Sequence, residues 1–138
     1  MTYFTINELT QSDTAKKKKI DNTPDEKITK NLNELIAFLN PLREAWGSAI
    51  RISSGYRCKA LNEAVNGSKT SVHTLGWAVD MCPANGEMEE FKKFVVGYLK
   101  DKKFDQCIIE KSGKTEWIHL GLYNNANKQR RMVFKLDA

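Results

Sequence analysis

Two short stretches of the sequence hold both of its histidines, and each histidine has a carboxylate close by. His73 lies seven residues before Asp80, and Glu116 lies three residues before His119. Imidazole nitrogens and a carboxylate oxygen are the ligands that zinc takes in hydrolytic sites, where three protein ligands leave a fourth position open. We therefore predict a zinc site formed by His73, Asp80 and His119.

Glu116 is predicted to act as a base rather than as a ligand. Peptide hydrolysis needs a group that takes a proton from the attacking water and returns it to the leaving amine, and a glutamate beside the metal suits this task. On a regular strand, however, residues three apart face opposite ways. Glu116 must therefore lie in the turn before the strand, or a bulge must re-aim it. The alternatives are a solvent hydroxide or another carboxylate such as Glu110.

The elements that must position these residues follow from local patterns. His73 and Asp80 are too far apart for one helical turn, so we expect His73 on a polar loop at 68–76 and Asp80 on a strand at 77–81. An aspartate inside an apolar strand needs a partner, because a buried charge without one is costly, and a metal would provide it. His119 must then come from a neighbouring strand.

The rest of the chain predicts an α+β domain, with helices early and strands late. Helices are expected at 5–11, 24–46, 59–65 and 87–102, and further strands at 50–53, 106–110, 117–122 and 132–136. Thr23 is the expected cap of the longest helix, and residues 12–22 are expected to form a connector. We expect an antiparallel sheet with helices packed on one side, and a hairpin loop at 112–114.

Length and composition fit a single domain, which we place at 1–138. Of the 138 residues 41% are hydrophobic, enough to bury a core. The sequence has no apolar run near the ~20 residues of a membrane span and opens without a leader pattern, so we expect a product that is cytoplasmic when made. The cysteines, Cys58, Cys82 and Cys107, have no paired spacing and fit reduced thiols. We expect a monomer.

The positive charge of the chain bears on its partners. A net charge of +5 would suit an anionic partner such as nucleic acid or a bacterial wall polymer. Much of the charge lies at 16–19 and 128–131, and neither run is interleaved with the aromatic residues that a single-strand binder uses for stacking. We therefore interpret both runs as solvated surface and expect no nucleic-acid partner.

The metal motif also resembles a known family. Ser71-x-His73-x-x-Gly76-x-Ala78-x-Asp80, followed by Glu116-Trp117-x-His119, is similar to the zinc D-Ala-D-Ala peptidases of the M15 class. That class includes wall-cleaving carboxypeptidases, dipeptidases and phage endolysins. Segments 53–57, 61–62 and 104–106 resemble further blocks of the family, so the resemblance spans roughly residues 5–122.

The resemblance implies a zinc domain of the DD-peptidase and hedgehog type, with His73, Asp80 and His119 as ligands and a glutamate base. By the same resemblance, Arg57 contacts the substrate peptide and stabilises the developing oxyanion, and Ser71 holds its loop or touches substrate. The implied activity is hydrolysis of a bond in the peptidoglycan stem peptide, by a D-Ala-D-Ala carboxypeptidase or an endolysin-type endopeptidase acting on the wall after release.

Other interpretations stay open. The same fold occurs in zinc-containing binding modules without turnover, and a base at Glu116 would favour the enzyme. Arg57 could be an ordinary surface arginine after a turn. Trp77 stands where many relatives have a smaller or charged residue, which changes the expected shape of the pocket. Cys82 lies on the same strand face as Asp80, and we interpret it as a bystander rather than as a ligand.

Overall fold

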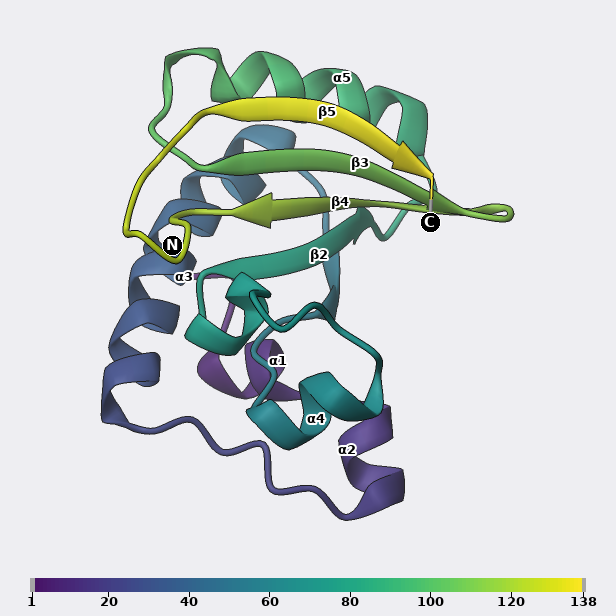
Figure 1. The fold of residues 1–138 in the computed structure, drawn as a ribbon. Helices are drawn as coiled ribbons and strands as arrows, with labels where there is room; N and C mark the ends of the chain where they lie inside the picture. Colours follow the sequence, from purple (N-terminus) through teal and green to yellow (C-terminus); the bar gives the residue numbers. More distant parts are fainter. Residues whose placement is uncertain (1, 138) are drawn as a thin grey trace.

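The structure, a computed structural model, describes residues 2–137. The chain forms helices and strands in the order shown in Figure 1. The α-helices are α1 (Ile6–Thr10), α2 (Asp13–Lys18), α3 (Glu26–Trp46), α4 (Lys59–Ala64) and α5 (Met88–Tyr98). The 3-10 helices are η1 (Val72–Leu75) and η2 (Leu99–Asp101), and the strands are β1 (Ile50–Ser54), β2 (Ala78–Pro83), β3 (Gln106–Ser112), β4 (Thr115–Gly121) and β5 (Met132–Asp137).

The five strands form one mixed sheet in the order β1-β2-β4-β3-β5. Four of the strands pair antiparallel, as predicted, but β5 runs parallel to β3, so the prediction of a purely antiparallel sheet is wrong. The segment between β4 and β5 passes the start of β3, so β5 begins at the end of the sheet where β4 finishes and runs in the direction of β3 (Figure 1). β5 is an edge strand.

The long helices α3 and α5 cover one face of the sheet and enclose the core (Figure 1). β2 and β4 supply to this core the side chains of Val79, Met81, Ile118 and Leu120, all fully buried. α3 and α5 supply Leu32, Leu35, Leu39, Phe91 and Val95, also fully buried. η1 lies next to β2, and α4 lies with α2 at the end of the molecule opposite α5 (Figure 1). The packing of the main helices on one side of the sheet agrees with the prediction.

Two helix starts differ from the sequence prediction. Residues 13–18, expected in a connector, form α2, capped by Ser12, whose hydroxyl accepts a hydrogen bond from the Ala15 amide. The long helix is capped by Asp25 rather than Thr23, because the Asp25 carboxylate accepts from the Ile28 amide at 2.8 Å. A carboxylate at this position also interacts well with the positive end of the helix dipole.

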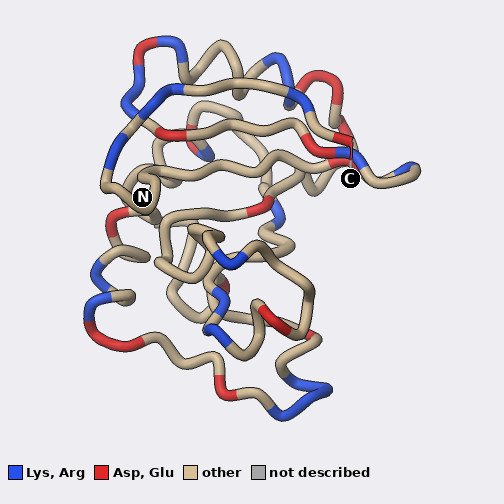
Figure 2. The backbone as a smooth tube through the Cα atoms, viewed as in Figure 1, with Lys and Arg blue, Asp and Glu red and all other residues tan. Residues whose placement is uncertain are grey.

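The basic residues are spread over the surface and do not form one stripe (Figure 2). Lys16, Lys17 and Lys18 occupy the last turn of α2, where positive charge is favourable at a helix C-terminus. In the second basic run, Arg130 forms two hydrogen bonds to the buried Asp105, at 2.7 and 2.9 Å. Within residues 2–137, no helix has the length and apolar character that crossing a membrane requires.

Candidate metal centre

Two of the predicted ligands face each other across a pair of antiparallel strands. Asp80 on β2 is the direct partner of His119 on β4. Directly opposed residues of an antiparallel pair share a face of the sheet, so both side chains project from the side that α3 and α5 do not cover. The sheet hydrogen bonds therefore fix the separation of these two ligands without help from a loop.

The third predicted ligand, His73, comes from the 3-10 helix η1 rather than from an irregular loop. Ser71 caps η1, because its hydroxyl accepts a hydrogen bond from the His73 amide at 3.3 Å. Gly76 ends η1 with φ +76° and packs closely against Ile28 and Leu32 of α3, where a side chain would be crowded. The motif glycine and serine thus set the two ends of the turn that carries His73.

The orientation of the His73 ring is fixed by the backbone of Gly55. His73 Nδ1 lies 2.8 Å from the Gly55 carbonyl oxygen, which can only accept, so Nδ1 must carry the proton. In the neutral ring Nε2 is then a bare lone pair, as a metal ligand requires. Gly55 itself must be glycine, because a Cβ there would lie 2.2 Å from the Leu9 carbonyl oxygen.

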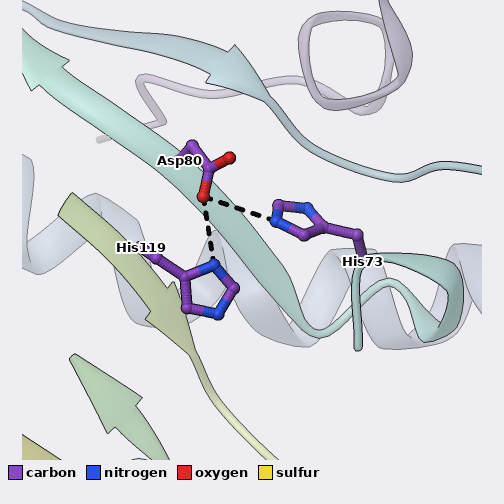
Figure 3. A group of neighbouring side chains, drawn as sticks. All are labelled: His73, Asp80 and His119. Carbon is purple, nitrogen blue, oxygen red and sulfur yellow. Dashed lines mark hydrogen bonds and ion pairs between the residues drawn. The ribbon is translucent and has the colours of Figure 1, made fainter. Parts of the chain in front are cut away.

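The three ligand atoms lie close enough together to share one ion (Figure 3). Oδ1 of Asp80 is 3.4 Å from His73 Nε2 and 3.0 Å from His119 Nδ1, and all three atoms lie within 4.8 Å of one another. Tetrahedral zinc with ligands at about 2.0–2.2 Å needs ligand atoms about 3.4 Å apart. Because Nε2 of neutral His73 and Oδ1 of Asp80 both present lone pairs, a cation between them is chemically favourable. Within residues 2–137, these side chains form the one cluster of His, Cys, Asp or Glu residues with the geometry to hold a metal ion.

Asp80 is held in its charged form. Burial by itself raises the pKa of this carboxyl, but when no metal is bound and the two imidazole rings are protonated, their hydrogen bonds and positive charges, His119 first, outweigh burial and hold the pKa below its usual value. A carboxylate that is ionised before the metal arrives need not lose a proton to bind it.

The metal-ligating group opens into a cleft of about 710 Å³ lined largely by polar residues. This volume falls within the range of small-molecule and peptide sites. The lining includes Arg57, Ser71, Glu110, Trp117, Asn124 and Arg130. Of the predicted site residues, the structure thus brings Arg57 and Ser71 to the same cleft as the three ligands.

Arg57 is held at the cleft by its neighbours. Its backbone amide donates to the His73 carbonyl oxygen at 3.1 Å, and its Nε is buried without a hydrogen-bond partner among the described residues. Burial lowers the pKa of Arg57, and the charges of Asp80 and Glu110 partly offset this effect. A half-buried guanidinium that lines a polar cleft is suited to an anionic group of a ligand.

Asn22 holds the turn that carries Arg57, and sequence reasoning missed it. The Asn22 carboxamide donates to the carbonyl oxygens of Tyr56 and Thr10, both at 2.9 Å, and accepts from the Cys58 amide at 2.7 Å. Its side chain thereby ties the segment before α3 to both sides of Arg57. No sequence signal marks this role, because Asn22 lies in the polar stretch interpreted as a connector.

The structure does not bring Glu116 to the three ligands. β3 and β4 pair without a register shift from Ser112 and Thr115 to Gln106 and Gly121, so neither the turn nor the bulge that Glu116 would need is present in these strands. Glu116 therefore projects to the helix-covered face, where its carboxylate bonds to Lys92 of α5 at 2.7 Å. This geometry corrects the expectation that Glu116 lies beside His119.

Cys82 lies on the same face of β2 as Asp80, as predicted. It pairs across the sheet with Arg51 of β1 and is not among the side chains that could share the ion. Its sulfur is a free thiol, and Asp80, two residues earlier, is the β2 residue in the cluster that could hold a metal.

Comparison with known proteins agrees with this geometry. No curated protein matches the sequence. The family model described as Peptidase M15 matches residues 2–121, which contain His73, Asp80 and His119 and every strand except β5. On this match, the chain belongs to the M15 family of peptidases.

Proposed function

We propose that the protein is a zinc-dependent metallopeptidase that hydrolyses a peptide bond in the stem peptide of bacterial peptidoglycan. The observation that carries this proposal is the cluster of His73, Asp80 and His119 in an open polar cleft, in a chain of a peptidase family. Two reactions fit the proposal: removal of a terminal D-Ala by a carboxypeptidase, and cleavage within the wall peptide by an endolysin-type endopeptidase.

Each residue has a part in the proposed reaction. His73, Asp80 and His119 would hold zinc, which when bound polarises a carbonyl oxygen and activates water at neutral pH. Arg57, which lines the cleft, would stabilise with its guanidinium the negative charge that develops on the scissile carbonyl oxygen. Ser71 would keep His73 in place through its cap on η1 and form part of the wall that contacts substrate.

A zinc-containing binding module without turnover is the second candidate. One observation favours it: Glu116, the base predicted from the sequence, projects to the opposite face and is bonded to Lys92. A site without a base would bind metal and peptide but hydrolyse slowly. The two candidates therefore differ in turnover and agree in metal content.

Digestion of defined muropeptides tests the proposal. The protein is loaded with one equivalent of zinc and incubated with purified stem peptides, both monomeric and cross-linked, and the products are identified by mass spectrometry. Loss of one alanine identifies a carboxypeptidase, and two peptide fragments identify an endopeptidase. Stoichiometric zinc binding with intact peptides would favour the binding module, and failure to bind zinc would contradict both candidates.

A further inference from the structure

We propose that Glu110, rather than Glu116, is the carboxylate that takes and returns the proton during peptide hydrolysis. This inference rests on the proposed peptidase function and assigns a residue within it. It is carried by the register of the β3–β4 hairpin, by the hydrogen bond between Glu110 and Trp117, and by the position of Glu110 in the wall of the metal cleft.

The hairpin register places Glu110 on the face of the ligands. On β3, Ile108 is the direct partner of His119, and Glu110 is the direct partner of Trp117. Because strand residues two apart share a face, Glu110 is a diagonal neighbour of His119 on that face. Diagonal neighbours lie about 7–8 Å apart at the backbone, a gap that a glutamate side chain can span.

Trp117 orients the Glu110 side chain. The indole Nε1 donates a hydrogen bond of 2.6 Å to Glu110 Oε2. This bond occupies one carboxylate oxygen and leaves the other for a water or a substrate amine. A general base must be held within hydrogen-bond reach of the proton that it transfers. The hydrogen bond from Trp117 holds Glu110 by one oxygen and leaves the other oxygen available for this transfer.

Glu110 also belongs to the charged group of the cleft. It lines the cavity together with Asp80, His119 and Arg57, and its charge acts on the Arg57 guanidinium. Glu110 is partly buried but accessible from the cavity. Glu116 lacks these features, because Lys92 engages its carboxylate on the helix-covered face.

The proton transfer can be written in full. The oxygen of a water molecule forms a bond to the peptide carbonyl carbon, and the Glu110 carboxylate accepts one proton of that water. As the carbon–nitrogen bond breaks, its electron pair leaves with nitrogen, and Glu110 passes the proton to that nitrogen. The products are a carboxylic acid and an amine, and Glu110 returns to its ionised form.

A matched pair of variants tests the assignment: Glu110→Gln and Glu116→Gln each replace one carboxylate by an amide of equal size on adjacent strands. Zinc affinity is measured by competition with a chromophoric chelator, and kcat and KM are measured on a stem peptide that the wild type cleaves. We expect both variants to keep zinc affinity within about threefold. We expect Glu110→Gln to lower kcat by at least ~100-fold and Glu116→Gln to leave it within about threefold.

Two further measurements separate a catalytic role from a structural one. Formate added to Glu110→Ala should restore part of the lost turnover, because a small carboxylate can occupy the vacated space and accept the proton. In ¹⁵N spectra of the metal-free protein, Glu110→Gln should shift the indole signal that Trp117→Phe removes, and Glu116→Gln should not. This second readout does not depend on activity.

The possible outcomes are distinct. A wild type that cleaves peptide, with a Glu110→Gln variant of similar kcat, overturns the Glu110 assignment alone. Loss of turnover in Glu116→Gln with zinc retained returns the role to Glu116. A zinc-loaded wild type that cleaves no stem peptide contradicts the proposed function and this inference with it. An indole shift caused by Glu116→Gln instead of Glu110→Gln would contradict the hairpin register.

Discussion

The two faces of strands β2, β4 and β3 differ sharply in chemistry. On the face under α3 and α5, Val79, Met81, Ile118 and Leu120 are fully buried and apolar. On the other face, the same strands carry Asp80, His119, Glu110 and Trp117. Because side chains alternate along a strand, a rigid core and a polar site can be built back to back on three strands.

This comparison shows that a short spacing in sequence does not place two residues of a strand on the same face of the sheet. Glu116 and His119 are three residues apart and seem to form one motif, yet the odd spacing sends them to opposite faces. Glu110 and His119 are nine residues apart and lie on different strands, yet the hairpin brings them to the same face. Proximity to a ligand in sequence is therefore weaker support for a catalytic role than a shared face of the sheet.

The largest effect, on zinc affinity, is expected from removing a predicted ligand on the polar face of the sheet. His119→Ala should lower zinc affinity by roughly 100-fold or more, since structural zinc sites share about 10–16 kcal/mol among four ligands. Compared with the metal-free wild type, the variant should lose about 0.5–1.5 kcal/mol in the free energy of unfolding, because it loses the contact of His119 with Asp80 but no residue of the main core. Chelator competition measures the affinity. Unchanged zinc affinity would show that the polar face does not hold the ion through His119.

The next largest effect is expected at Leu120, which follows His119 in β4 and lies on the helix-covered face of the sheet. Leu120→Ala should lower the free energy of unfolding by about 2–5 kcal/mol, because it leaves a cavity in a fully buried core. Urea unfolding of the metal-free protein gives the value. Under conditions where the variant is folded, it should still bind about one zinc per chain. A strong loss of zinc affinity in folded Leu120→Ala would mean that the two faces are not separable.

Arg57 tests whether the site extends beyond the sheet, because it comes from the turn after β1. Arg57→Lys should lower kcat by ~10-fold with little change in KM, because an ammonium cannot reproduce the planar fork at the developing oxyanion. Steady-state kinetics on a defined stem peptide measures both constants. A raised KM with unchanged kcat would instead indicate that Arg57 binds a ground-state carboxylate.

The smallest effect is expected at the ion pair between Glu116 and Lys92. Both side chains are partly accessible, so a double-mutant cycle with Glu116→Ala and Lys92→Ala should give a coupling of about 0.2–1 kcal/mol in the free energy of unfolding. The coupling should decrease in high salt. A coupling near zero would show that the contact is not maintained in solution, and Glu116 would then be free to turn elsewhere.

Much of the molecule was predictable because its signals are local. Thr5 caps α1 and Gly47 ends α3, as their residue types predict, and the apolar period of α3 gives its buried face. The cluster of His73, Asp80 and His119 was predictable because zinc accepts few residue types and the chain has two histidines. The helix α2 could also have been found, since Ser12 before Asp13 is a cap signal and lysines follow in its last turn.

Contacts between distant segments decided the rest. The parallel pairing of β5 with β3 depends on the path of residues 122–131, which Asp105 fixes by binding Arg130, a pair 25 residues apart. The clamp of Asn22 on the turn of Arg57 joins segments 34 to 36 residues apart. No local pattern encodes such pairs, because their partners meet only once the chain has folded.

The choice between Glu110 and Glu116 as the base shows most clearly which features follow from the sequence and which depend on tertiary structure. The sequence determined that carboxylates lie near the last predicted ligand, but whether Glu110 faces the cleft depends on one residue of hairpin register. Thr115 pairs with Ser112, so the loop has two residues and Glu110 opposes Trp117. A three-residue loop over 112–114 would set Glu110 opposite Glu116 instead. Because a slip of one residue would reverse the face of every β3 side chain, only the tertiary structure could place Glu110 in the cleft, whereas the odd spacing from His119 turns Glu116 to the other face in either register.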